Sequence, residues 1–126
     1  DFARDVGATA FRERVVVALR HAQKSAVARR RMVCATVTPG ALTLTSAAAF
    51  GAGACVNAMA GPDGANPAAT SPSATVVLAA IPAGPLFFQP SGTVTSDAAG
   101  TTIANFALAV TGQAPITVTG ATGRVQ

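Results

Sequence analysis

The chain has 126 residues, the size of one domain with a modest hydrophobic core. Half of the residues are hydrophobic and only 11% are charged, so the surface is weakly solvated and suits packing against copies or partners. No run of about 18 apolar residues occurs and no signal-peptide pattern opens the sequence, which excludes a membrane span within these residues.

The net charge of +4 is concentrated at one end of the chain. Residues 1–31 hold eight Lys/Arg and three Asp/Glu, whereas residues 32–126 hold one Arg and two Asp. We interpret the basic excess as the solvated face of a helix. Nucleic acid and an anionic lipid surface are the alternative partners for such a charge.

The first predicted element is a helix from about Asp5 to Arg31. Apolar residues recur there every three or four positions and fall on one arc of a helix, which is typical of a helix lying on a core. Charged residues gather on the opposite side, which predicts a solvated stripe. The core-facing set is Phe11, Val15, Ala18, Leu19, Ala22 and Ala26, and the stripe is Glu13, Arg20, Lys24 and Arg31. Arg29, Arg30 and Arg31 close the helix, where cations complement its dipole.

Alternating β-branched residues follow the helix. The runs "MVCATVT" and "ALTLTSA" flank Pro39-Gly40, which predicts a hairpin with a type II turn. On this hairpin Val33, Ala35 and Val37 share one face, with Leu42 and Leu44 as candidates to pack beside them.

Residues 47–73 lose this periodicity and are rich in Ala, Gly and Pro, so we expect a long surface excursion. Further strands are predicted from "ATVVLAAI", "LFFQ", "GTVTS", "TTIANFALAV" and "ITVT". The expected architecture is α+β, one domain over residues 1–126. A long helix (1–31) packs on an antiparallel sheet of about six or seven short strands drawn from 32–126.

The run "TGATG" (119–123) resembles the glycine-rich opening of a dinucleotide-binding domain. Such a site also needs a helix after the glycines, whose N-terminus holds the pyrophosphate. Only Arg124, Val125 and Gln126 follow Gly123 in this sequence. We therefore expect a β-hairpin instead, with a strand at Ile116–Thr119, a turn through Gly120–Gly123 and a short edge segment.

No residue pattern predicts catalysis or a cofactor. His21 is the only histidine and lies at the edge of the apolar arc with no acid to orient it, and the five acidic residues are scattered. Cys34 and Cys55 fit no zinc spacing, so they are either two buried thiols or one disulfide, which the even count favours in an oxidising compartment. We expect a protein that is not an enzyme, with no metal, cofactor or small-molecule substrate.

The order of these pieces resembles the globular domain of GspH/FimT-type pilins and pseudopilins. Leu19, Ala22, Ala26, Arg29 or Arg30, and Cys34 occupy the places of the family's helix-to-strand run. Phe88, Pro90 and Gly92 resemble its F-x-P-x-G turn, and Gly123, Arg124 and Val125 resemble its closing Gly-Arg-Val. The resemblance covers the chain except 47–73, and the Cys-bearing junction is most similar to MSHA-type minor pilins.

The resemblance implies a non-catalytic minor subunit of a type IV pilus or type II secretion system. An apolar half-helix would precede Asp1, anchor the subunit in the inner membrane and then pack inside a filament with other subunits. The domain would face the periplasm, which favours a Cys34–Cys55 disulfide. Two alternatives remain: a FimT-like DNA-binding minor pilin, and a periplasmic binding module of similar topology.

The DNA alternative depends on a C-terminal G-R-x-R pattern in the family. Gly123 and Arg124 match it, but Gln126 replaces the second Arg. Arg29, Arg30 and Arg31 are the other candidate contacts for DNA or a protein partner. Apart from Arg124, residues 32–126 are nearly free of cations, so we do not favour DNA.

Overall fold

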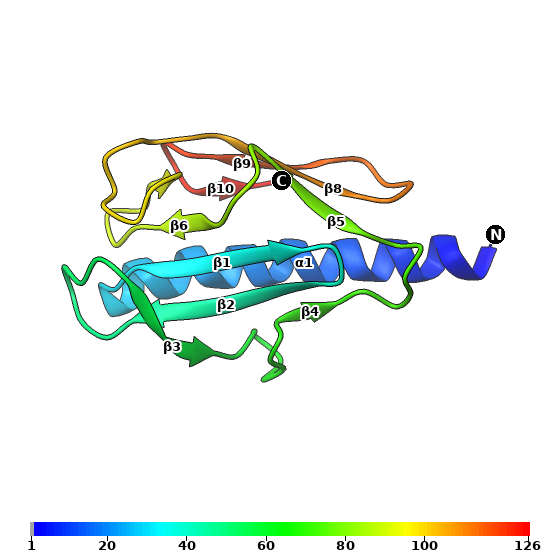
Figure 1. Ribbon diagram of the computed structural model, residues 1–126, viewed down its shortest axis with the longest axis horizontal. Coiled ribbons are helices and arrows are strands. Elements are labelled where there is room, and N and C mark those ends of the chain that lie inside the picture. The colour runs from blue at the N-terminus through cyan, green and yellow to red at the C-terminus, as the bar shows by residue number, and fades with distance from the viewer. Residues whose placement is uncertain (1) are drawn as a thin grey trace.

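The computed structural model describes residues 2–126, and their side chains from Val6 onward. One long helix is followed by ten short strands in this part of the chain (Figure 1). The order is α1 (Phe2–Arg29), β1 (Val33–Thr38), β2 (Ala41–Ala47), β3 (Cys55–Met59), β4 (Ala69–Thr70), β5 (Leu78–Ile81), β6 (Leu86–Phe88), β7 (Val94–Thr95), β8 (Phe106–Val110), β9 (Ile116–Thr119) and β10 (Arg124–Val125).

Helix α1 ends two residues earlier than the sequence predicts. Arg30 has a left-handed backbone, with φ at 56°, and the N–H of Arg31 donates to the carbonyl of Ala26 at 3.2 Å. This is the 6→1 bond of a Schellman motif, in which the left-handed position is usually glycine. Arg30 and Arg31 therefore lie beyond the helix, and only Arg29 belongs to its last turn.

Strands β1 and β2 form the predicted hairpin. Ala35 pairs with Leu44, and Val37 pairs with Leu42, so the expected apolar residues share one face. The predicted turn type is wrong, because Gly40 does not adopt the positive φ that a type II turn requires at this position.

The expected loop at 47–73 contains two strands that were not predicted. Both β3 and β4 pair with β2, at its two ends. Apart from buried Met59, these strands are made of small or exposed residues without alternation, so pairing with β2 holds them extended and their own pattern does not. The remainder of 47–73 is turns and bends, as expected.

The strands form two antiparallel sheets where one was expected. The first has the order β3-β2-β1-β6-β7 with β4 beside β2, and the second has the order β10-β9-β8-β5. The N–H of Val94 on β7 donates to the carbonyl of Gly120 at 2.8 Å, which links the edge of the first sheet to the turn after β9. Figure 1 shows α1 running behind β1, with β8, β9 and β10 of the second sheet above it in this view and its N-terminal end projecting beyond the strands.

The core lies between α1 and these sheets. The predicted apolar arc of the helix is buried, with each of its members 0–1% exposed: Phe11, Val15, Ala18, Leu19, Ala22 and Ala26. Side chains of both sheets join the same cluster, among them Leu44, Phe88, Leu108 and Ile116. One helix face thus organises strands from the whole length of the chain.

Candidate functional site

A disulfide lies on the outer face of the first sheet, on the side away from α1. Cys34 on β1 and Cys55 on β3 are bonded, with their Cα atoms 6.2 Å apart, as predicted. A small apolar cluster surrounds the bridge on the side of β1 away from the main core, and it includes Met32, Ala47 and Phe87. The bridge therefore pins the segment before β3 to the sheet.

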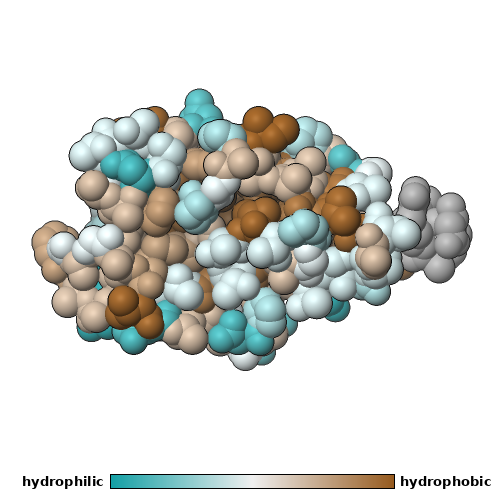
Figure 2. All heavy atoms as spheres, viewed as in Figure 1, coloured by the Kyte–Doolittle hydropathy of each residue, from teal (hydrophilic) through white to brown (hydrophobic). Residues whose placement is uncertain are grey.

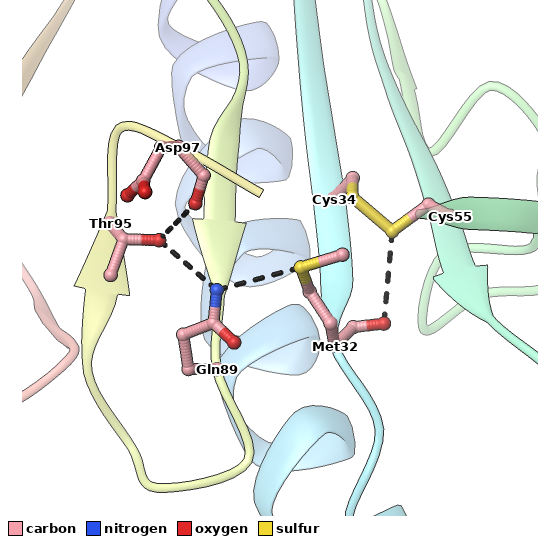
Figure 3. The surroundings of a disulfide bond; sticks show 6 residues. All are labelled: Met32, Cys34, Cys55, Gln89, Thr95 and Asp97. Atoms are coloured by element: carbon pink, nitrogen blue, oxygen red, sulfur yellow. Dashed lines mark hydrogen bonds between the residues drawn. A yellow bond between two sulfur atoms is a disulfide. The ribbon is translucent and has the colours of Figure 1, made fainter. Parts of the chain in front are cut away.

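A polar chain runs from this cluster to the next hairpin (Figure 3). Gln89 Nε2 donates to Met32 Sδ at 3.5 Å and to Thr95 Oγ1 at 3.1 Å, and Thr95 Oγ1 donates to the carbonyl of Asp97 at 2.7 Å. The Asp97 carboxylate accepts bonds from the Thr101 hydroxyl and from the N–H groups of Thr101 and Thr102, which lowers its pKa below the usual value. This arrangement orders residues 89–102 and holds no catalytic pair.

Removing the disulfide is expected to destabilise the domain by about 3 kcal/mol, because the bridge closes a loop across a sequence separation of 21 residues. The change to make is the double variant Cys34→Ala/Cys55→Ala, since both half-cystines lie at or near the small apolar cluster. Urea unfolding followed by circular dichroism measures the loss. Reduced wild-type protein should match the variant, and unfolding midpoints equal to that of the oxidised protein would contradict the expectation.

The two motifs that resemble pilin turns meet on the helix. Phe88 is buried, and the turn after it ends at Gly92, with φ at +96°. A Cβ placed on Gly123 would lie 2.5 Å from the carbonyl oxygen of Gly92 and 2.8 Å from Cγ of Gln23. Gly92 and Gly123 thus let the 88–92 turn and the closing hairpin approach each other above α1.

The "TGATG" run is the turn of a β-hairpin, as the sequence predicts. Strand β9 spans Ile116–Thr119, and Val125 pairs with Val118 across the turn. Gly120 packs against backbone, since a Cβ there would lie 2.2 Å from the carbonyl oxygen of Ala104. The glycines serve close packing inside the protein and form no phosphate-binding turn.

Arg20 does not belong to a purely solvated stripe, which corrects the expectation from the sequence. Its Nε and Nη2 donate to the carbonyl of Val125 at 3.2 and 3.0 Å, so the helix holds β10. Arg12, nearer the N-terminus of α1, acts in the same way on the segment before β9. It donates to the carbonyls of Ala114 and Pro115 at 2.8 and 3.2 Å. Helical periodicity placed Arg20 at the surface but gave no signal for backbone partners about a hundred residues away.

The candidate cationic contacts fall at two places. Arg124 follows the closing turn, and its guanidinium lies 2.6 and 2.9 Å from the Gln126 amide oxygen in the amide orientation that satisfies both groups. Arg29, Arg30 and Arg31 are exposed where α1 ends. Arg30 is over the ring of Phe50, 5.7 Å from its centroid, a contact that no sequence pattern predicted.

The remaining titratable groups stay apart. His21 is half-buried at the edge of the helix arc. In the described part of the chain, no group of three or more His, Cys, Asp or Glu side chains comes together to hold a metal ion. Likewise, no helix between residues 2 and 126 combines the length and apolarity that a bilayer crossing needs.

Similarity to a known protein was found by comparing structures and not by comparing sequences. No family model matches the sequence, and no curated protein matches it. The fold is similar to that of the type IV minor pilin FimU from Pseudomonas aeruginosa strain PAO1, solved by crystallography. The match has a TM-score of 0.63 at 19% sequence identity and covers 100% of this chain and 91% of FimU.

The chain has a type IV minor pilin fold. At 19% identity the likeness concerns architecture: a long N-terminal helix packed on antiparallel strands. Within this pilin fold, the disulfide and the Gly92–Gly123 contact lie toward the C-terminal half of α1. The side of α1 that points away from both sheets is exposed.

Proposed function

We propose that this chain is the globular domain of a non-catalytic minor pilin or pseudopilin. It serves a type IV pilus or a type II secretion system and assembles into, or primes, a filament through its N-terminal helix. In this proposal a preceding apolar helix anchors the subunit in the inner membrane, and the domain faces the periplasm before it enters the pilus or pseudopilus. Its partners are other pilin subunits and the assembly machinery.

The observation that carries the proposal is the second face of α1. One face is fully buried under the sheets, yet the helix also exposes Val6, Val17 and Val27 to 53%, 47% and 44%. Val17 lines a 260 Å³ hollow with Pro62 and Ala68, between the helix and the turn before β4. All three valines lie on the side of the helix opposite the buried arc, and in the proposed filament this side faces the neighbouring subunit.

Val17→Asp tests this role. In the full-length protein in its native host, we expect the variant to be depleted at least about tenfold from the filament fraction, because a charge would be buried against the neighbouring subunit. Immunoblots of sheared pili or overproduced pseudopili, normalised to whole-cell protein, give the measurement.

The matched control is Val77→Asp, which adds the same charge at a side chain exposed to 42% on the loop before β5. It should enter filaments normally. Equal depletion of both variants, or of neither, would contradict the assembly role of the helix face.

A DNA-binding role is the second candidate, and the geometry does not favour it. Arg124 is already engaged by Gln126, and the other candidate cations follow the end of α1. We expect no salt-sensitive, sub-micromolar complex with duplex DNA in fluorescence anisotropy, and no difference between wild type and Arg124→Ala. A tight complex that Arg124→Ala abolishes would replace the assembly proposal with DNA uptake. The binding-module alternative predicts instead a chain without a preceding membrane helix.

A further inference from the structure

A groove opens where α1 ends, and we call it the terminal groove. Its volume is about 360 Å³, and its walls are residues 50–53 on one side and residues 89–91 and 98–100 on the other, with Met32 and Thr93 between them. Figure 2 shows mainly weakly apolar surface at this end of the molecule. The lining itself contains no charged side chain.

Both walls of the groove are fixed in place. The Cys34–Cys55 bridge and the bond from the Ala47 N–H to the Met32 carbonyl, at 2.9 Å, flank the 50–53 wall. The other wall is held by the polar chain through Gln89 and by the bonds that Asp97 accepts. A preformed groove costs little ordering when it binds a partner.

Arg30 and Arg31, which follow the end of α1, adjoin one rim. Arg30 lies over Phe50, which is 68% exposed and lines the groove, and Arg31 directly precedes Met32. None of the carboxylates that the structure describes lies within 4.0 Å of Arg29, Arg30 or Arg31. Asp97, which directly precedes the 98–100 wall, keeps its negative charge, but its carboxylate is bonded within its own loop and forms no ion pair with these arginines. The rim therefore carries positive charge that the described part of the fold does not neutralise.

We propose that the terminal groove binds an acidic, extended segment of a partner protein. An apolar side chain of that segment enters the groove beside Phe50, and flanking carboxylates pair with the guanidinium groups of Arg30 and Arg31. A second copy of this chain is not the occupant, because its five acidic residues are scattered and form no acidic segment. Nucleic acid fits less well, since one exposed aromatic ring and three adjacent cations offer little to a phosphate backbone.

The test uses the 126-residue chain and a fluorescein-labelled peptide of sequence Glu-Asp-Leu-Glu-Asp, read by anisotropy. We expect saturable binding that weakens at least about fivefold in Phe50→Ala and in Arg30→Asn, since Asn tolerates the left-handed backbone at that position. The peptide Gln-Asn-Leu-Gln-Asn should bind at least about tenfold more weakly. Unchanged thermal melting of both variants, monitored by circular dichroism, shows that they remain folded.

Lys24→Gln is the matched control, because it removes one exposed positive charge that lies on α1 and does not line the groove. It should change the affinity by less than about twofold. The proposal is overturned if the acidic peptide does not bind, if Lys24→Gln weakens binding as much as Arg30→Asn, or if an oligonucleotide of twelve thymidines displaces the peptide. Because the assay needs only the domain, its result is independent of filament assembly.

Discussion

Leu19→Asp is expected to unfold the domain. Leu19 is 0% exposed at the centre of the helix face that packs on both sheets. Burying an unpaired carboxylate there costs more than about 4 kcal/mol, which is comparable to the whole stability of many domains of this size. The variant should lack the cooperative thermal transition that wild type shows by circular dichroism.

Val17→Asp is the internal control for this prediction. It places the same side chain two residues away on the same helix, at a position that is 47% exposed. Both variants place Asp in the helix, and the helix propensities of Leu and Val differ by less than about 1 kcal/mol, so a larger difference between the variants reports the burial of charge. Equal melting temperatures for the two would mean that the helix does not pack on the sheets as described.

Gly120→Ala is expected to destabilise the domain by about 3 kcal/mol, although it adds a single methyl group. The new Cβ would lie 2.2 Å from the carbonyl oxygen of Ala104 and 2.9 Å from its nitrogen. These are backbone atoms that cannot rotate away. Gly120 is also fixed by two bonds: its N–H donates to Asn105 Oδ1 at 2.9 Å, and its carbonyl accepts from the Val94 N–H. Relief of the clash therefore has to break the link between the two sheets.

Gly40→Ala is the matched control for Gly120→Ala. A Cβ on Gly40 meets nothing within 4 Å, and its φ is not positive. The change should be neutral or stabilise the fold by up to about 1 kcal/mol, through the lower entropy of the unfolded chain. Urea unfolding of both variants measures the difference. A Gly120→Ala protein as stable as Gly40→Ala would show that the turn is not packed on Ala104.

The parts of this fold that the sequence predicts are those set by local periodicity. The apolar arc through Phe11 and Leu19 predicts the buried helix face, because side chains three and four residues apart share one side of a helix. The alternation around Pro39-Gly40 predicts the first hairpin and its shared apolar face, and "ITVTGATGRV" predicts the last hairpin. The even cysteine count favoured a bridge in an oxidising compartment, and the resemblance to pilins, which implies such a compartment, strengthened the prediction that the structure confirms.

The parts that the sequence does not predict depend on distant partners. Strand β3 carries no alternation, and β2 together with the disulfide at Cys55 holds it in place. The division into two sheets depends on the position of β5 beside β8, which loop composition does not specify. The sequence indicated Arg29, Arg30 and Arg31 as candidate contacts but missed the terminal groove beside them, because Phe50 lies in a glycine-rich segment without pattern and its contact with Arg30 exists only once the helix end meets that segment.

The anchoring of β10 on the helix has a consequence for the order of folding. Arg20 binds the carbonyl of Val125, and the side chain of Val125 is itself buried against a core that begins at Ala8. The ribosome synthesises Arg20 about a hundred residues before Val125, so the helix emerges long before the strand that it binds. Until residues 116–126 have been synthesised, part of the hydrophobic face of the nascent helix stays exposed to water. We therefore expect folding of this chain to depend on chaperones more than folding of a protein whose N-terminal segments complete their own core.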